Sequence, residues 1–259
     1  MKKAKRIVAL LLTLAMLAAV STAAYALPAG GFVPVKATNY TLVDGNWKEG
    51  NVRTLTYKGD GRLTKITSVN PSSGTTSSTS YKWKGNLITK VNWSDGDYQI
   101  FKYKGGRRIS YTYDYGVKYS YKFKWKKKTL TYTTEDGTIS TTVNGKNQIV
   151  KTVRTGTNNS YTTKYTYYGN GNRKSYVQKT SEGVVTTHKY NSKGYLTLEK
   201  GKNYSRTYTY KTKKGKIRER ICKYQENGRS GERKVVYSKW KKVSHIRNCD
   251  AWGYSITLG

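Results

Sequence analysis

Proline and long apolar runs are nearly absent from this sequence of 259 residues. Its three prolines are Pro28, Pro34 and Pro71, and none falls inside a segment that we expect to form a strand. Proline removes a ladder hydrogen bond, so this placement is compatible with a chain rich in β-strands. After Val20, no stretch approaches the roughly 20 apolar residues that a membrane-spanning helix requires.

Acidic residues and histidines are also scarce. The chain has 14 Asp and Glu against 49 Lys and Arg, a formal net charge of +35, and only two histidines, His188 and His245. A catalytic site needs an acid, base or nucleophile held beside an orienting group, and scattered acids in turns do not supply one. The two histidines and two cysteines lack zinc-site spacing. We therefore predict no enzyme activity, no catalytic residue, no metal site and no cofactor.

The first 26 residues have the pattern of a secretory signal. Basic residues between Lys2 and Arg6 precede an apolar run from Ile7 to Val20, and a small-x-small pattern ends at Ala26. We expect the mature protein to begin close to Leu27 and to be secreted, either extracellular or associated with the cell surface. We do not expect it to be an integral membrane protein.

One unit recurs along the rest of the chain: an aromatic pair one residue apart, a glycine turn, a second alternating strand and another glycine turn. Such a unit predicts a β-hairpin. Self-similarity at a period of 20 to 27 residues indicates a repeat architecture. The equivalent anchor positions are Tyr57, Trp83, Tyr103, Phe123, Val143, Tyr167, Tyr190, Tyr210 and Tyr237.

The turns carry strong hairpin signals, among them Asp60-Gly61, Asp95-Gly96, Asp136-Gly137 and Asn144-Gly145. The segment 126–128, which is three lysines, replaces the glycine expected after the anchor Phe123. About nine units give about 18 strands, and an open sheet wider than about ten strands curls or closes. The sequence therefore predicts an all-β fold, an antiparallel meander of about nine β-hairpin repeats curled into a spiral, barrel-like or shell-like sheet.

The segment Gly59–Thr64, which reads GDGRLT after Tyr57, resembles the YD/RHS repeat family. Tyr113-Asp114 is the only place where the Tyr-Asp pair of that family is preserved. The resemblance implies a long meander wound into a spiral or shell, in extracellular proteins concerned with binding, adhesion or enclosing a toxin. We accordingly divide the chain into a signal peptide (1–26), an N-terminal lead-in or capping unit (27–54) and a YD/RHS-like repeat domain (55–259).

Cys222 and Cys249 each lie 12 residues after an anchor, so they occupy one repeat position. A secreted protein can hold a disulfide, and we expect this pair to form a C-terminal staple. Equivalent positions in successive hairpins are about 9.5 Å apart, whereas a disulfide needs Cα atoms within about 7 Å. Two free buried thiols are therefore the alternative.

Lysines flank the anchors on the face opposite the aromatic rings. We expect them to lie on one sheet face and to bind a polyanion through their summed field. Nothing in the chain indicates a module that reads nucleic-acid sequence. The candidate residues are Lys58, Lys82, Lys84, Lys102, Lys104, Lys122 and Lys124.

Three functional hypotheses follow from these features. The first is a secreted, non-enzymatic repeat protein that binds the cell envelope, an anionic cell-surface polymer or a glycan through the lysine-rich face. The second is a structural or adhesive scaffold that contacts a protein partner through its sheet edges. The third is an outer-membrane barrel, suggested by the even strand number and by the alternating segment 252–258, and it ranks last because lysine opposes tyrosine along the strands.

Overall fold

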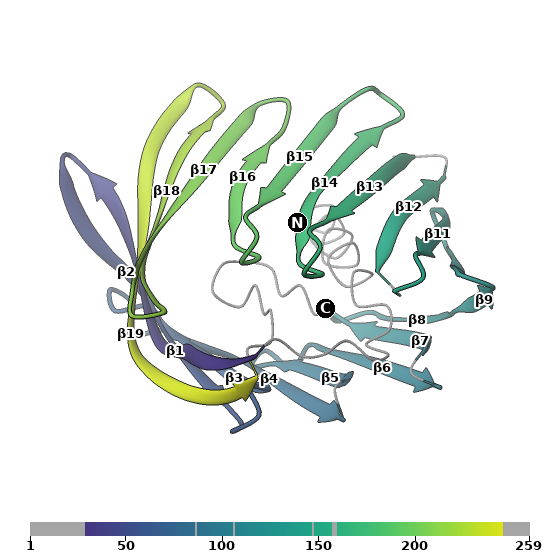
Figure 1. Ribbon diagram of the computed structural model, residues 1–259, viewed down its shortest axis with the longest axis horizontal. Helices are drawn as coiled ribbons and strands as arrows, with labels where there is room; N and C mark the ends of the chain where they lie inside the picture. The colour runs from purple at the N-terminus through teal and green to yellow at the C-terminus, as the bar shows by residue number, and fades with distance from the viewer. Residues whose placement is uncertain (1–28, 86, 106, 147, 157–159, 246–259) are drawn as a thin grey trace.

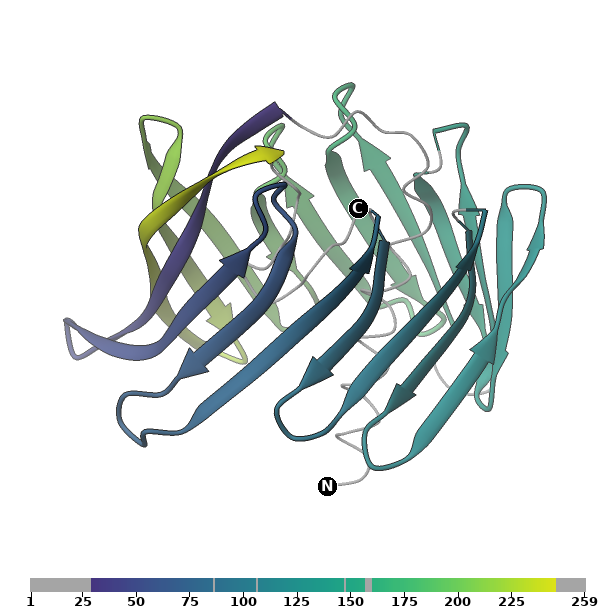
Figure 2. The same ribbon diagram turned by 90° about the horizontal axis from the view of Figure 1, so that it is seen from below.

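The computed structural model describes residues 29–85, 87–105, 107–146, 148–156 and 160–245, which form one antiparallel sheet of 19 strands. Figures 1 and 2 show the hairpins standing side by side around a nearly closed barrel. The part of the chain described contains no helix with the length and hydrophobicity needed to cross a membrane.

The strands follow one another around the barrel in chain order. The first ten are β1 (Ala29–Val43), β2 (Asn46–Tyr57), β3 (Leu63–Val69), β4 (Thr76–Lys84), β5 (Leu87–Trp93), β6 (Tyr98–Lys104), β7 (Arg107–Asp114), β8 (Lys118–Lys122), β9 (Lys124–Lys126) and β10 (Thr129–Thr134). The remaining nine are β11 (Gly137–Val143), β12 (Ile149–Thr155), β13 (Tyr161–Tyr167), β14 (Arg173–Thr180), β15 (Val185–Tyr190), β16 (Leu196–Lys200), β17 (Tyr204–Lys213), β18 (Lys216–Glu226) and β19 (Arg229–His245).

The two outermost strands in sequence close the ring. β1 pairs with β19 from Ala29↔His245 to Thr41↔Arg233, and β1 also pairs with β2. On the other side, β8 pairs with β7 and β9 pairs with β10. β8 and β9 are consecutive segments of one extended run interrupted at Phe123, so together they occupy one position in the ring. The 19 strands therefore fill 19 − 1 = 18 positions, the even number that an all-antiparallel barrel requires.

A β-bulge recurs near the first turn of the hairpins. The register shifts between Thr56 and Tyr57, and corresponding shifts occur in six further hairpins. A bulge inserts one residue into a strand and bends it, which favours the curvature that a closed barrel requires. It also sets an inward residue of the second strand opposite the anchor in six of these hairpins and opposite Thr212 in the β17–β18 hairpin. These bulge partners are Leu63, Ile88, Arg108, Ile149, Arg173, Leu196 and Ile217.

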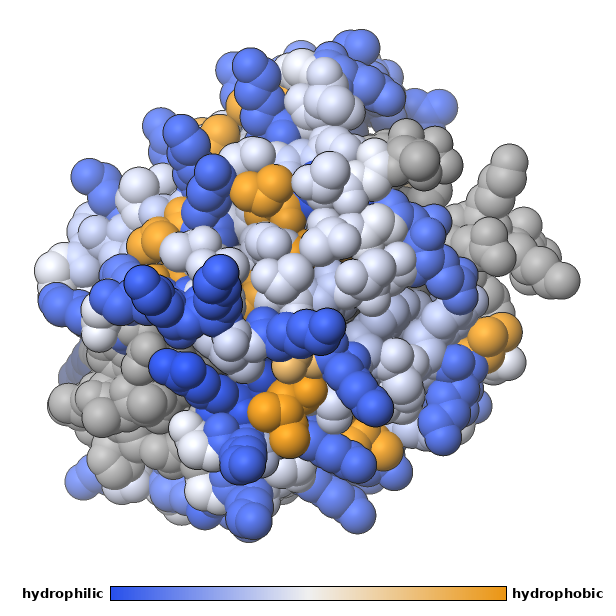
Figure 3. Space-filling model, turned by 90° about the vertical axis from the view of Figure 1, so that its right-hand side faces the viewer, coloured by the Kyte–Doolittle hydropathy of each residue, from blue (hydrophilic) through white to orange (hydrophobic). Residues whose placement is uncertain are grey.

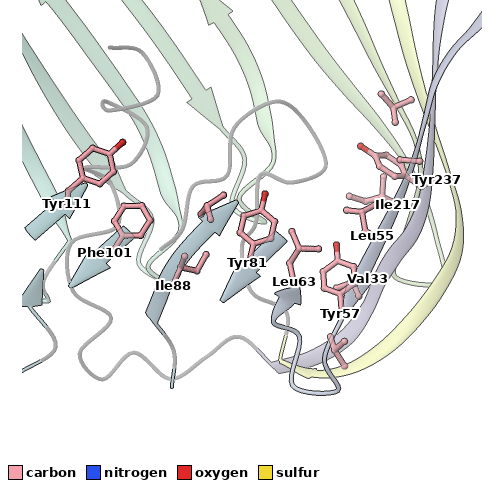
Figure 4. Close-up of a cluster of buried hydrophobic side chains, with 14 residues drawn as sticks. Val33, Leu55, Tyr57, Leu63, Tyr81, Ile88, Phe101, Tyr111, Ile217 and Tyr237 are labelled. Atoms are coloured by element: carbon pink, nitrogen blue, oxygen red, sulfur yellow. The ribbon is translucent and has the colours of Figure 1, made fainter. Parts of the chain in front are cut away.

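The two faces of the sheet differ in chemistry. Aromatic and aliphatic side chains such as Leu63, Tyr81, Phe101 and Tyr111 project to one side of their strands, as Figure 4 shows. They are at most 6% exposed. Lysine, threonine and serine dominate the opposite face, and the side of the molecule seen in Figure 3 is mainly hydrophilic with a few apolar patches. The aromatic face is therefore the inner face of the barrel.

The structure confirms the predicted all-β antiparallel meander and selects the barrel among the three ways of curling. Two local expectations need correction. Pro34 lies inside β1, where it pairs with Trp240 of β19. The β1–β2 ladder begins only at Lys36, so the missing N–H of Pro34 removes no hydrogen bond to β2. At 126–128, Lys127 adopts the positive φ of 52° that we expected a glycine to supply.

Candidate functional site

The seven candidate lysines lie on the outer side of neighbouring hairpins. All are exposed, on β4, β6, β8 and β9 and in the turn after β2. They include Lys82, which is paired with Lys90, and Lys102, which is paired with Ser110. The sheet is curved, so these residues follow the convex outside of one wall and do not form a flat face.

The cysteine pair is only partly placed. Cys222 lies on β18 opposite Tyr208 and is buried, and burial raises the pKa of its thiol. Cys249 lies outside the described residues, as do residues 1–26 and 252–258. The disulfide and the secretory signal therefore stay predictions.

The inner face repeats one hydrogen bond between hairpins. The polar tip of an inward aromatic residue donates to the main-chain carbonyl of the bulge partner in the preceding hairpin. Each accepting residue lies just beyond the end of the ladder to the next hairpin, so the bond satisfies its carbonyl and ties each hairpin to its neighbour. The bonds are Trp83 Nε1 to Leu63 at 2.7 Å, Tyr103 Oη to Ile88 at 2.9 Å, Trp125 Nε1 to Arg108 at 2.8 Å, Tyr167 Oη to Ile149 at 2.7 Å and Tyr210 Oη to Leu196 at 2.8 Å.

Two bulge partners are arginines where the other five hairpins have leucine or isoleucine. Arg108 is 3% exposed, and its guanidinium carbon lies 4.5 Å from the centroid of the Phe101 ring. The guanidinium of Arg173 lies within 6 Å of the rings of Tyr165, Tyr176 and Tyr190. Cation–π contacts of this kind stabilise a charge among aromatic side chains. The inner face is therefore aromatic and cationic together.

A carboxylate centre joins four neighbouring strands. Glu199 on β16 accepts hydrogen bonds from Tyr208 Oη at 2.5 Å and Arg206 Nη1 at 3.2 Å, both on β17, and its other oxygen lies 3.1 Å from His188 Nε2 on β15. Arg206 Nε in turn donates to Glu226 on β18. Glu199 therefore has three side-chain partners, and Arg206 links it to a second carboxylate.

Glu199 is ionised at neutral pH despite its burial. Burial raises its pKa, but hydrogen bonds from His188 and Tyr208 and the charges of His188 and Arg206 outweigh that effect and lower it to about 2. Within the described ranges, no group of three or more His, Cys, Asp and Glu side chains is placed to hold a metal ion. The arrangement therefore suits electrostatic binding and cross-linking of strands.

The chain was compared with known proteins in sequence and in structure. No family model matches it, and no curated protein matches its sequence. It is similar to the solved structures of two porin-like proteins, from Bacteroides uniformis ATCC 8492 (13% identity, TM-score 0.44) and Bacteroides vulgatus ATCC 8482 (11% identity, TM-score 0.38). Each similarity covers 79% of this chain and 97% of the other.

The resemblance to the YD/RHS repeat family is wrong. The hairpins close into a barrel at the β1–β19 ladder and do not wind into a spiral or shell. Glycine turns and alternating aromatic residues are required by any hairpin meander, which is why the GDGRLT segment suggested that family. The assignment of 55–259 to a YD/RHS-like domain is withdrawn with it.

The functions inferred from that resemblance are corrected as well. Binding of an anionic polymer or glycan by a secreted repeat protein assumed one lysine-rich sheet face, whereas the strands close into a ring and the lysines follow its convex outside. The adhesive alternative assumed free sheet edges, which the β1–β19 ladder removes. The expectation that the chain is not an integral membrane protein is withdrawn as well, because it assumed a repeat sheet of that family, whereas the strands close into a ring.

The sequence analysis missed the inner polar groups. His188 was considered only as a possible zinc ligand, and Glu199, Arg108 and Arg173 were not considered. The signal that could have found the arginines is the substitution of Arg for Leu or Ile five or six residues after an anchor. That signal becomes visible only once the bulge register is known.

Proposed function

We propose that this protein is a porin-like β-barrel of the cell envelope whose inner face takes small polar solutes. The observation that carries the proposal is the β1–β19 ladder, because it turns a long meander into an enclosed ring. In that ring, aromatic and arginine side chains face a common interior. The role is non-enzymatic.

The number of strands supports an interior that side chains do not fill. About eight strands enclose a space that inward side chains can occupy, whereas barrels of roughly 16 to 18 strands leave an aqueous channel. With β8 and β9 counted as one, the ring has 19 − 1 = 18 strand positions. If the strands lie about 4.8 Å apart and tilt by about 40°, a circular ring of this size has a diameter of about 36 Å between opposite backbones. Such a width exceeds what two opposing layers of side chains span.

The chemistry of the inner face favours polar solutes over lipids. The half-buried Arg173 lies within 6 Å of the rings of Tyr165 and Tyr176, which are also half-buried. Hydroxyl and guanidinium groups bind polar solutes through hydrogen bonds, and aromatic rings supply flat contact surfaces. The signal pattern of residues 1–26 supports placement in the cell envelope.

Size-selective quenching of tryptophan fluorescence tests the proposal. Trp83 faces inward, and Trp47 lies on the outer face, where Lys234 covers its ring at 4.3 Å. In variants that retain only one of these tryptophans, acrylamide should quench both, whereas a quencher linked to a large dextran should quench only Trp47. If the dextran-linked quencher also reached Trp83, the interior would be open to the outside. If acrylamide failed at Trp83, small solutes would have no access.

A further inference from the structure

One row of inward side chains crosses β10, β11, β12 and β13. Tyr132 is paired directly with Ile139, Ile139 with Arg154, and Arg154 with Tyr161. Directly paired residues in antiparallel strands have Cβ atoms about 4.5–5.5 Å apart and point to the same face. Tyr132, Arg154 and Tyr161 therefore lie along one line of the inner wall.

These three side chains are buried, and most of their hydrogen-bonding groups lack a partner. Arg154 and Tyr132 are each 3% exposed and Tyr161 is 7% exposed. Within the described part of the chain, no acceptor meets Arg154 Nε or Nη1, and the hydroxyls of Tyr132 and Tyr161 have no partner. More than about 90% of buried polar groups in proteins are paired, so four such atoms in one row point to a missing acceptor.

The charge around the row favours a negatively charged acceptor. Arg154 contacts one carboxylate, with Nη2 at 3.5 Å from Asp136 Oδ2, and the Asp136 side chain is 58% exposed. Burial raises the pKa of Tyr132, while Arg108 and Arg154 both act to lower it. Arg154 acts on Tyr161 in the same direction. The two hydroxyls therefore lie in the positive field of a guanidinium and can donate toward an anion.

We propose that Arg154, Tyr132 and Tyr161 form a binding site on the inner wall for a small oxyanion, either a phosphate or a carboxylate. The unpartnered Nε and Nη1 lie on different edges of the planar guanidinium, and each is a charged donor that can bind an anion oxygen. A hydroxyl on each side along the row can donate to the same group. The site deepens the proposed function and rests on it, because it names the solute class that the interior takes.

The test is titration of the purified full-length protein with inorganic phosphate, followed by 31P NMR, and separately with acetate, followed by calorimetry. Wild-type protein should show saturable binding of at least one anion, and the preferred anion distinguishes a phosphate from a carboxylate solute. Arg154→Gln should weaken that binding by about tenfold or more, because a charged donor pair is lost. The matched control is Lys151→Gln, which removes one positive charge from the exposed, outward side of the same strand and should change the affinity less than twofold.

A second variant tests the proposal even if Arg154→Gln does not fold. The double substitution Tyr132→Phe with Tyr161→Phe keeps both rings and the guanidinium. Its Tm in anion-free buffer should be no lower than that of wild type, because the hydroxyls that it removes have no partner there. The increase in Tm that the preferred anion produces in wild type should be at least halved in this variant.

Three results would overturn the site: no saturable binding of either anion, equal affinity in Arg154→Gln and wild type, or equal loss in Lys151→Gln and Arg154→Gln. The first two indicate that water alone satisfies these groups, and the third indicates general attraction by the net charge. If anion binding depends on Arg154 but acrylamide does not quench Trp83, the proposal of a solute-accessible barrel is refuted. The proposal of an anion site at Arg154 is then retained.

Discussion

The carboxylate of Glu199 should make the stability of the barrel depend on acid. Glu199 joins β15, β16 and β17 through His188, Tyr208 and Arg206, and Arg206 extends the connection to Glu226 of β18. Its pKa is about 2 in the folded protein against an ordinary value of 4.5. A carboxyl with a lowered pKa stabilises the fold above its ordinary pKa, and that contribution is lost as the pH falls toward the lowered value.

The size of the effect follows from these values. A lowering of the pKa from 4.5 to about 2 corresponds to about 3 kcal/mol at about 1.4 kcal/mol for each tenfold change. The side chain of Glu199 is 17% exposed, but that of Arg206 is 35% exposed, and solvent screening weakens this partner. We therefore expect Glu199 to contribute about 2 kcal/mol of unfolding free energy above pH 5, most of it lost by pH 2.

Chemical denaturation of wild type and Glu199→Gln between pH 2 and pH 7 measures this contribution. The variant should be less stable by about 2 kcal/mol near pH 6, and the difference should shrink below pH 4 as the wild-type carboxylate becomes protonated. Glu182→Gln, at an exposed turn residue, is the control and should retain the pH dependence of wild type. A Glu199→Gln variant that matched wild type at pH 6, or a difference that persisted unchanged to pH 2, would refute this reasoning.

Two further substitutions test local features of the barrel by denaturant unfolding. Tyr167→Phe removes a hydroxyl that donates at 2.7 Å to the main-chain carbonyl of Ile149, and it should lower the free energy of unfolding by about 1 kcal/mol. Tyr132→Phe, which removes a hydroxyl without a partner among the described residues, should leave that free energy unchanged. Equal losses in the two variants would argue against the inter-hairpin bond. Gly137 has a φ of 138°, and in Gly137→Ala the new Cβ would lie 2.1 Å from the Thr155 carbonyl oxygen, so the free energy of unfolding should fall by more than about 2 kcal/mol. In the control Gly59→Ala the new Cβ meets no atom within 4 Å, and the free energy of unfolding should change by less than about 0.5 kcal/mol. A tolerated Gly137→Ala would contradict this close approach of β11 to β12.

Hairpins were predictable from the sequence because their signals are local. Tyr81 and Trp83 alternate with lysines, Asp95-Gly96 turns the chain, and both the face and the turn follow from residues within one unit. Period-two alternation specifies which side chains share a face even when the partner strand is unknown. The meander and its buried aromatic face were therefore within reach of sequence reasoning.

Closure and the inner polar groups were not predictable because they depend on contacts between distant residues. The β1–β19 ladder joins segments about 200 residues apart, and Pro34 in β1 argued locally against a strand. Arg108 became recognisable as an inward bulge partner only once its pairing with Tyr103 was known. The partners of Glu199 lie 7 to 11 residues from it on β15 and β17, but which side chains face it depends on a strand register that alternation alone does not specify.

The central claim, that the sheet closes into a barrel, is tested most directly by hydrogen exchange in the first half of β1. Residues 31–35 pair only with β19, since the β1–β2 ladder begins at Lys36. In a closed barrel, the β19-facing amides in this segment should be protected as strongly as those of the β6–β7 hairpin, and the facing amides of 241–243 should be protected with them. Exchange of residues 31–35 at the rate of unpaired amides, with β2 to β18 still protected, would show an open sheet and contradict the account.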